Sequence, residues 1–107
     1  NLTRIEAGDI DDVTLGKAVI YSTVSSNKRE SYDISIVKVD KTNKDNRNFV
    51  IKIDDKNLLE KTGGIVQGMS GSPIVQNGKL IGAITHVFIN DPTRGFGISI
   101  GNMLESY

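Results

Sequence analysis

The stretch SPIVQNGKLIGAITHVF, residues 72–88, decides the fold of this 107-residue chain. Two apolar runs flank Asn77-Gly78, a dipeptide that is typical of a tight type I′ turn, because asparagine and glycine both tolerate positive φ. The flanking runs contain several β-branched residues, which favour strands. The stretch therefore predicts an antiparallel hairpin.

Outward from this hairpin, the sequence predicts further short strands separated by polar turns. Within Tyr32–Asp40 the apolar side chains change face halfway along, which indicates a β-bulge or a strand buried on both sides. Asp54–Gly64 has an acidic start and a glycine stop, so we expect a short helical turn. The other predicted elements are strands at Lys17–Val24, Phe49–Ile53 and Phe96–Ile100, and the start of a C-terminal helix at Gly101–Tyr107. Six or so antiparallel strands predict an all-β fold, a small barrel or sandwich.

The composition excludes several classes of function. Thirteen basic and thirteen acidic residues cancel, so no net field draws the chain to nucleic acid or to an anionic membrane. There is no cysteine, which rules out disulfides and a thiolate nucleophile. The carboxylates of residues 8–13 lack the other ligands of a calcium loop. We therefore expect no metal, no cofactor and no nucleic-acid partner.

Ser70 is the candidate nucleophile, because it lies in the tight run Gly68-Met69-Ser70-Gly71. A nucleophilic serine needs an exposed hydroxyl, backbone N–H groups aimed at the developing oxyanion, and a base. The N–H groups of Gly68 and Ser70 can converge as an oxyanion hole, since glycine permits unusual backbone angles. The alternative is a glycine-rich turn that merely precedes a strand. The only histidine is His86, sixteen residues after Ser70, and whether it is the base stays open at this point.

The run G-M-S-G-S-P, residues 68–73, resembles the G-D-S-G-G-P nucleophile motif of the trypsin-like serine peptidases. The likeness continues without a gap to Thr85. It implies an antiparallel barrel like the second barrel of such an enzyme, with a short C-terminal helix. It also implies a substrate groove along Thr85, His86 and Val87 to Phe88, with Thr85 beside the triad aspartate.

The same resemblance implies a primary specificity pocket floored near Gly64 and lined by Ile65 and Val66. Since none of these residues is charged, the pocket should prefer an uncharged side chain. Met69 stands where the family has an aspartate, so the chain should not need the zymogen switch in which that aspartate pairs with a freed N-terminus.

Residues 49–104, with the signature G-G-I-V-Q-G-M-S-G-S-P, resemble the end of the SpoIVB peptidase family. This resemblance implies a nucleophile at Ser70 and a triad aspartate at Asp55, whereas trypsin-like enzymes take the acid from their first barrel. Asp54 competes with Asp55, because either can cap the helical turn that follows. The family's histidine lies in an upstream G-H segment. Residues 1–107 are therefore expected to be the C-terminal portion of a serine peptidase domain, inactive alone. A triad of Ser70, His86 and Asp55 is the rival.

The resemblance also implies a biological setting. Members are membrane-anchored, carry a PDZ domain before the peptidase domain, and are secreted from the forespore into the space between forespore and mother cell. They cleave themselves and a regulator of an intramembrane protease, which leads to sigma-factor activation. The partners would be a protein substrate, the missing N-terminal half of the peptidase domain and the PDZ domain. Self-association through an uncovered face near Ser70 is also expected. The alternative function is a non-catalytic β-barrel interaction module.

Overall fold

The computed structural model describes residues 6–22, 30–43, 47–56, 59–60, 69–88 and 90–105. The strands are β1 (Glu6–Ala7), β2 (Gly16–Ser22), β3 (Glu30–Val39), β4 (Phe49–Ile53), β5 (Pro73–Gln76), β6 (Lys79–Val87) and β7 (Arg94–Ser99). A short 3₁₀ helix, η1 (Ile10–Asp12), precedes β2, and the α-helix α2 (Ile100–Glu105) follows β7. The last strand was predicted at Phe96–Ile100, and in the structure it begins two residues earlier and gives way to α2 at Ile100.

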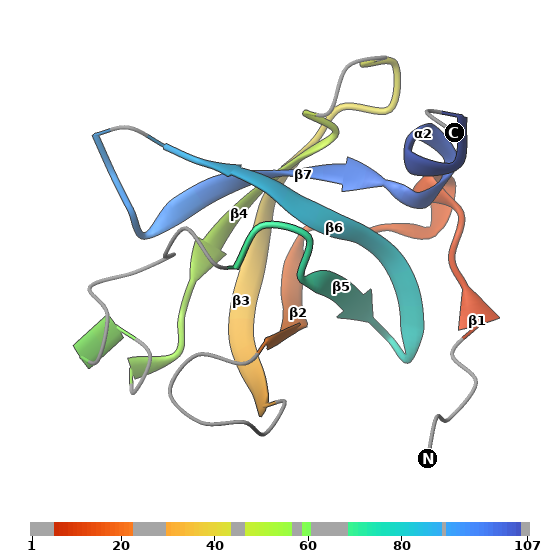
Figure 1. Ribbon diagram of the computed structural model, residues 1–107. Coiled ribbons are helices and arrows are strands. Elements are labelled where there is room, and N and C mark those ends of the chain that lie inside the picture. The colour runs from red at the N-terminus through yellow and green to blue at the C-terminus, as the bar shows by residue number, and fades with distance from the viewer. Residues whose placement is uncertain are drawn as a thin grey trace.

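The strands close into one antiparallel barrel (Figure 1). Around the barrel the order is β2, β3, β4, β7, β6 and β5, and β5 pairs back with β2. The predicted all-β barrel with a short C-terminal helix is therefore confirmed. Strand β1 lies outside the barrel and pairs in parallel with the start of β6, through Glu6 with Lys79 and Ala7 with Leu80. The sequence analysis did not predict this strand.

The central hairpin has the predicted turn. Asn77 and Gly78 both have positive φ, 53° and 78°, as a type I′ turn requires. The turn joins β5 to β6, whose backbones then pair antiparallel. The predicted bulge in β3 is also present, at Ile36 to Lys38, where Val37 is 40% exposed. The extra residue shifts the alternation: Val37 and Lys38 are both exposed, and Val39 packs against the core again.

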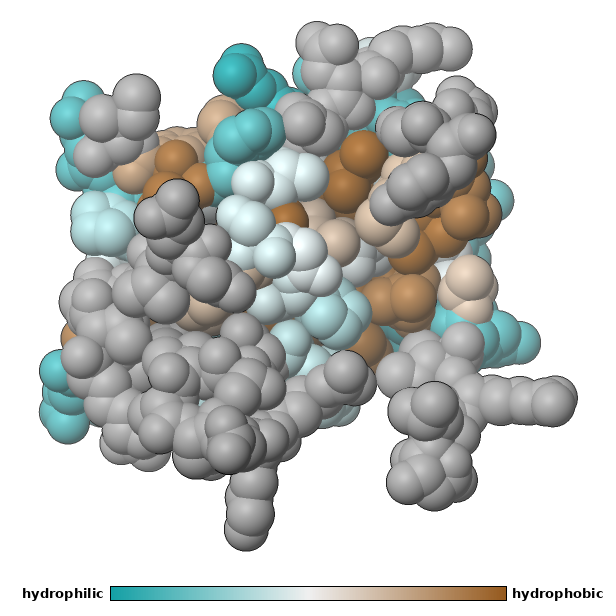
Figure 2. Space-filling model, in the orientation of Figure 1, coloured by the Kyte–Doolittle hydropathy of each residue, from teal (hydrophilic) through white to brown (hydrophobic). Residues whose placement is uncertain are grey.

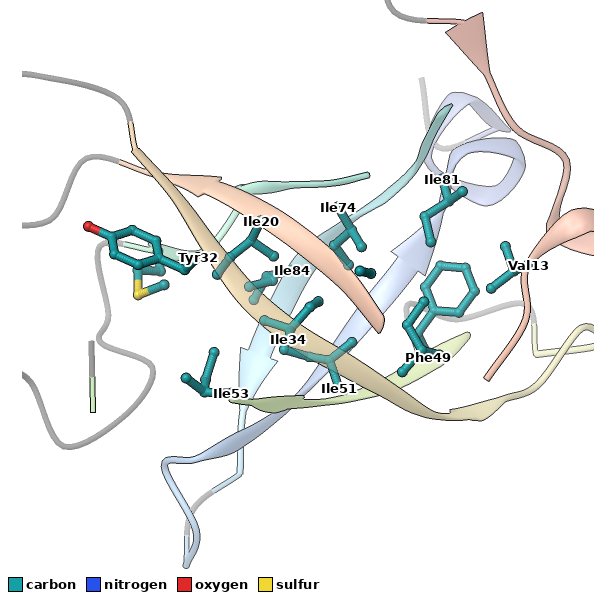
Figure 3. Close-up of a cluster of buried hydrophobic side chains, with 13 residues drawn as sticks. Val13, Ile20, Tyr32, Ile34, Phe49, Ile51, Ile53, Ile74, Ile81 and Ile84 are labelled. Atoms are coloured by element: carbon teal, nitrogen blue, oxygen red, sulfur yellow. The ribbon is translucent and has the colours of Figure 1, made fainter. Parts of the chain in front are cut away.

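The core fills the barrel with mostly aliphatic side chains, and strands β2 to β6 contribute to the cluster (Figure 3). Alternate residues of a strand point to the same side, so the inward set repeats at every second position. At Gly82, β6 approaches β7 too closely for any side chain, and at Gly97 a core side chain of β5 leaves little room. A Cβ on Gly82 would lie 2.0 Å from the Ile98 carbonyl oxygen, and one on Gly97 would lie 2.9 Å from the end of Ile74. The glycines are therefore what permits the barrel to close at this seam.

Two buried amides tie the connecting segments to the barrel. Asn48 is 1% exposed; its Nδ2 donates to the carbonyls of Asp40 and Asn43, and its Oδ1 accepts from the Ser99 N–H and from Asn102. This arrangement holds α2 against the connection between β3 and β4. Gln76 ties the segment before β2 to β5 in the same way. Its Oε1 accepts from the Thr14 N–H, and its Nε2 donates to the carbonyls of Thr14 and Lys17. Among the described residues, every buried side-chain nitrogen and oxygen has a partner.

Candidate active site

Ser70 lies exposed on a turn just before β5, and the buried residues nearest to it in sequence are Met69 and Ser72. Met69 is 1% exposed and belongs to the core, and Ser72 is 8% exposed. Two backbone hydrogen bonds join the turn to Ile84 of β6. The Gly71 N–H donates to the Ile84 carbonyl (2.7 Å), and the Ile84 N–H donates to the Ser72 carbonyl (3.0 Å). The turn therefore presents the Ser70 hydroxyl to solvent from a backbone that is fixed on either side.

Gly71 makes this turn feasible. Its φ is +89°, in the region that side chains with a Cβ rarely adopt, so glycine is required immediately after the serine. The role of Met69 is one that the sequence analysis missed, since Met69 was considered only as a replacement for an acid. The sequence does hold a clue: Met69 is the one large apolar side chain between Gly68 and Ser72, and a lone apolar residue in a polar turn indicates an anchor.

Ser70 and Thr85 are brought together, as the predicted register requires. The Ser70 Oγ lies 3.4 Å from the Thr85 carbonyl oxygen, to which it donates. Thr85 sits at a bulge in β6, between Ile84 and His86, and its hydroxyl donates to the Phe96 carbonyl (3.2 Å).

Beyond Thr85, one edge of β6 faces away from β7. The Phe88 N–H donates to the Arg94 carbonyl (3.0 Å), and in an antiparallel ladder the hydrogen-bonded pairs alternate with pairs that are not. Val87, paired with Gly95, therefore directs its N–H and C=O away from β7. Among the described strands, the pairing of β6 with β5 ends at Ala83. This outer edge of β6 can accept an extended peptide as an additional strand.

The two candidate acids lie directly after β4. The N–H groups of Asp54 and Asp55 both donate to the Asp33 carbonyl, at 2.9 and 3.1 Å. The Asp54 carboxylate accepts a hydrogen bond from the Ser35 hydroxyl. The Asp55 carbonyl accepts from the Leu59 N–H (3.1 Å), which places Asp55 at the N-cap of the predicted helical turn. Asp55 is half-buried and Asp54 is exposed.

The other half of the predicted oxyanion hole, Gly68, lies outside the described residues, as do Gly64, Ile65 and Val66 of the predicted primary pocket. Among the described residues, no group of three or more His, Cys, Asp or Glu could hold a metal ion. A search of the same residues finds no helix with the length and apolar character needed to span a bilayer.

His86 is exposed and contributes to a surface hollow of about 420 Å³ at the far end of β6. We call it the aromatic hollow; it is lined by Arg47, His86, Val87, Phe88, Asn90, Asp91 and Phe96. The rings of Phe88 and Phe96 lie 4.7 Å apart between centroids, tilted by 42°. The space-filling view shows apolar atoms gathered where β6 ends (Figure 2).

The one carboxylate among the residues that line the aromatic hollow, that of Asp91, has hydrogen-bond and ion-pair partners close to it in sequence. The Thr93 hydroxyl, and then the Thr93 N–H, donate to the Asp91 carboxylate and hold the pKa of Asp91 below its usual value of 3.8. Arg94 adds to this, with its Nε 3.4 Å from the same carboxylate. Asp91 is therefore ionised at neutral pH and already paired.

A closed antiparallel barrel with an exposed serine on a turn, beside a strand edge that no described strand covers, is the arrangement expected of a serine-peptidase barrel. The family model described as SpoIVB peptidase S55 matches residues 2–104, nearly the whole chain, and the chain belongs to this family. The match also includes the N-terminal strands, which precede residues 49–104, where the sequence resemblance was found. A comparison with curated proteins gives no match. The family match thus identifies a SpoIVB-type serine peptidase domain.

Proposed function

We propose that the protein is a serine endopeptidase in which Ser70 attacks the scissile carbonyl. The observation that carries the proposal is the Ser70 turn itself: an exposed hydroxyl fixed by a buried Met69 and by hydrogen bonds to β6. In this proposal the N–H groups of Gly68 and Ser70 stabilise the oxyanion. Asp55 orients the catalytic histidine and stabilises its charged form.

The substrate would bind as an extended strand on the outer edge of β6. With its scissile residue over Ser70, the peptide would run antiparallel to β6 and exchange hydrogen bonds with Val87, whose backbone groups face outward. This places Thr85, His86 and Val87 along the residues that precede the cut. The uncharged primary pocket remains a prediction from the sequence.

The catalytic base would be a histidine from outside residues 1–107. Within the described residues, His86 forms no hydrogen bond with Ser70; the hydroxyl donates to the Thr85 carbonyl instead. His86 faces the aromatic hollow, beside Phe88 and Phe96. Its position supports a role in lining the substrate groove rather than in proton transfer.

Membership of the SpoIVB family supports the wider setting. In this setting the partners are a protein substrate, the upstream part of the peptidase domain and a PDZ domain. The substrate would be a regulator of an intramembrane protease, and the enzyme would also cleave itself. The membrane-anchored protein would act after secretion from the forespore, in the space between the forespore and mother-cell membranes, and would lead to sigma-factor activation.

The test is labelling of the full-length protein with a fluorophosphonate probe, which reacts with activated serines. We expect labelling that Ser70→Ala abolishes and that Asp55→Asn slows by several orders of magnitude, about 10⁴-fold in a triad of this kind. Asp54→Asn is the matched control and should keep its rate. His86→Ala should also still label, because His86 is not the base.

A wild-type protein that is folded and yet unlabelled would contradict the proposal and favour a non-catalytic barrel. If labelling is lost in Asp54→Asn but kept in Asp55→Asn, Ser70 remains the nucleophile and the triad acid is Asp54 instead of Asp55.

A further inference from the structure

We propose that the aromatic hollow is a specificity subsite that binds an acidic side chain of the substrate, a glutamate four residues before the cut, through Arg47. The inference rests on the proposed function and names the substrate class of the same site.

Strand geometry sets which substrate side chain reaches the hollow. A residue bound over Ser70 lies beside Thr85, and two paired strands advance at equal spacing, so the residue two positions upstream lies beside Val87. Successive side chains of a strand alternate between its faces. The next residue upstream, the fourth before the cut, therefore shares a face with His86 and Phe88, which line the hollow.

Arg47 supplies the charge that selects the side chain. Its guanidinium carbon lies over the Phe96 ring, 5.0 Å from the ring centroid, which is a cation–π contact. A cation–π contact uses none of the guanidinium N–H donors as hydrogen-bond partners, and their planar fork suits a carboxylate in bidentate geometry. Among the described residues no carboxylate forms an ion pair with Arg47, whereas Lys41 pairs with Asp11 and Arg94 with Asp91.

The two hollows around Arg47 hold equal numbers of cationic and acidic side chains, so selection of an anion rests on the hydrogen-bond donors of Arg47 rather than on net charge. A smaller hollow of about 170 Å³ continues from the aromatic hollow and shares Arg47 and Phe96 with it. Its other charged side chains are Lys38 and Asp40. The Asp40 carboxylate accepts from the N–H (3.1 Å) and the hydroxyl (3.0 Å) of Thr42, so local donors already engage it. The remaining titratable groups that face the hollow are His86 and Asp91, and Asp91 is paired with Arg94.

The test compares matched internally quenched peptides that differ only in the fourth residue before the cut, which is Glu, Gln or Lys. A parent peptide is first found by sequencing the products that the full-length protein releases from a mixed peptide library. We then measure kcat/KM with the active protein and the dissociation constant with its Ser70→Ala variant. Glu should be preferred over Gln by about threefold to tenfold in both measurements, the size expected of a partly exposed charged hydrogen bond.

Variants of Arg47 identify the residue responsible. Arg47→Gln should reduce the Glu preference to within about twofold, Arg47→Lys should retain part of it, and Arg47→Glu should shift the preference to Lys. Lys41→Gln removes one positive charge from a different surface and should leave the preference unchanged. Because Arg47 is exposed, the preference should also fall between about 0.05 and 0.5 M salt, which a purely structural effect would not do.

The outcomes separate this inference from the proposed function. Ser70-dependent cleavage without a Glu preference, or with a preference that survives Arg47→Gln, would overturn the subsite and leave the peptidase intact. A Glu preference that depends on Arg47, with cleavage that survives Ser70→Ala, would support the subsite and contradict Ser70 as the nucleophile.

Discussion

At the scale of single residues, the serine turn depends on Met69 more than on any other side chain near it. Met69 is 1% exposed and packs in the core, one residue before an exposed nucleophile candidate. Met69→Ala should lower the free energy of unfolding by about 2–5 kcal/mol, because it removes buried methylenes and leaves a cavity. Met69→Leu keeps the volume and should cost less than about 1.5 kcal/mol. Denaturant unfolding of the peptidase domain measures both.

The same pair of variants connects the core to the chemistry. If Met69 holds the turn, Met69→Ala should also slow probe labelling of Ser70 under conditions where the protein remains folded, and Met69→Leu should not. Equal labelling rates in the two variants would show that the hydrogen bonds of Gly71 and Ser72 suffice to fix the turn.

At the scale of elements, closure of the barrel depends on the seam between β6 and β7. A Cβ on Gly82 would lie 2.0 Å from a backbone oxygen of β7, which cannot move without separating the strands. Gly82→Ala should therefore destabilise the protein by at least the roughly 1–3 kcal/mol typical of overpacking. Gly101→Ala is the matched control: Gly101 lies in α2 with no atom within 4 Å of its added Cβ, so alanine should stabilise by up to about 1 kcal/mol. Thermal unfolding of both variants distinguishes a seam effect from a general loss of glycine.

Most elements could be predicted because their causes are local. The Asn77-Gly78 turn fixes its own backbone angles, and the change of face in β3 indicated a bulge or a doubly buried strand, of which the structure has the bulge. β1 could not be predicted, because two residues carry no periodicity and their pairing with β6 is decided by distant sequence. The start of β7 at Arg94 is set in the same way by its pairing with β4 and β6.

At the scale of the whole molecule, some parts of the candidate site could be predicted from the local sequence and others could not. The exposure of Ser70 and its neighbour Thr85 follow from a motif whose register is continuous through the hairpin. The aromatic hollow could not be predicted, because Arg47 and Phe96 come from segments far apart in the sequence. The choice between Asp54 and Asp55 stays a prediction, since the two share one carbonyl as a backbone partner.

The catalytic competence of the chain is also a property of the whole molecule. If the base is supplied from outside residues 1–107, the isolated chain should turn over peptides at least about 10²–10⁴-fold more slowly than the full-length protein, the usual contribution of a general base. Circular dichroism should first establish that the isolated chain has its strands, and light scattering over a concentration series should test for self-association through the Ser70 face. Measurable turnover by the monomeric chain, abolished by His86→Ala, would instead assign the base to His86 and make the Ser70, His86 and Asp55 triad complete within these residues.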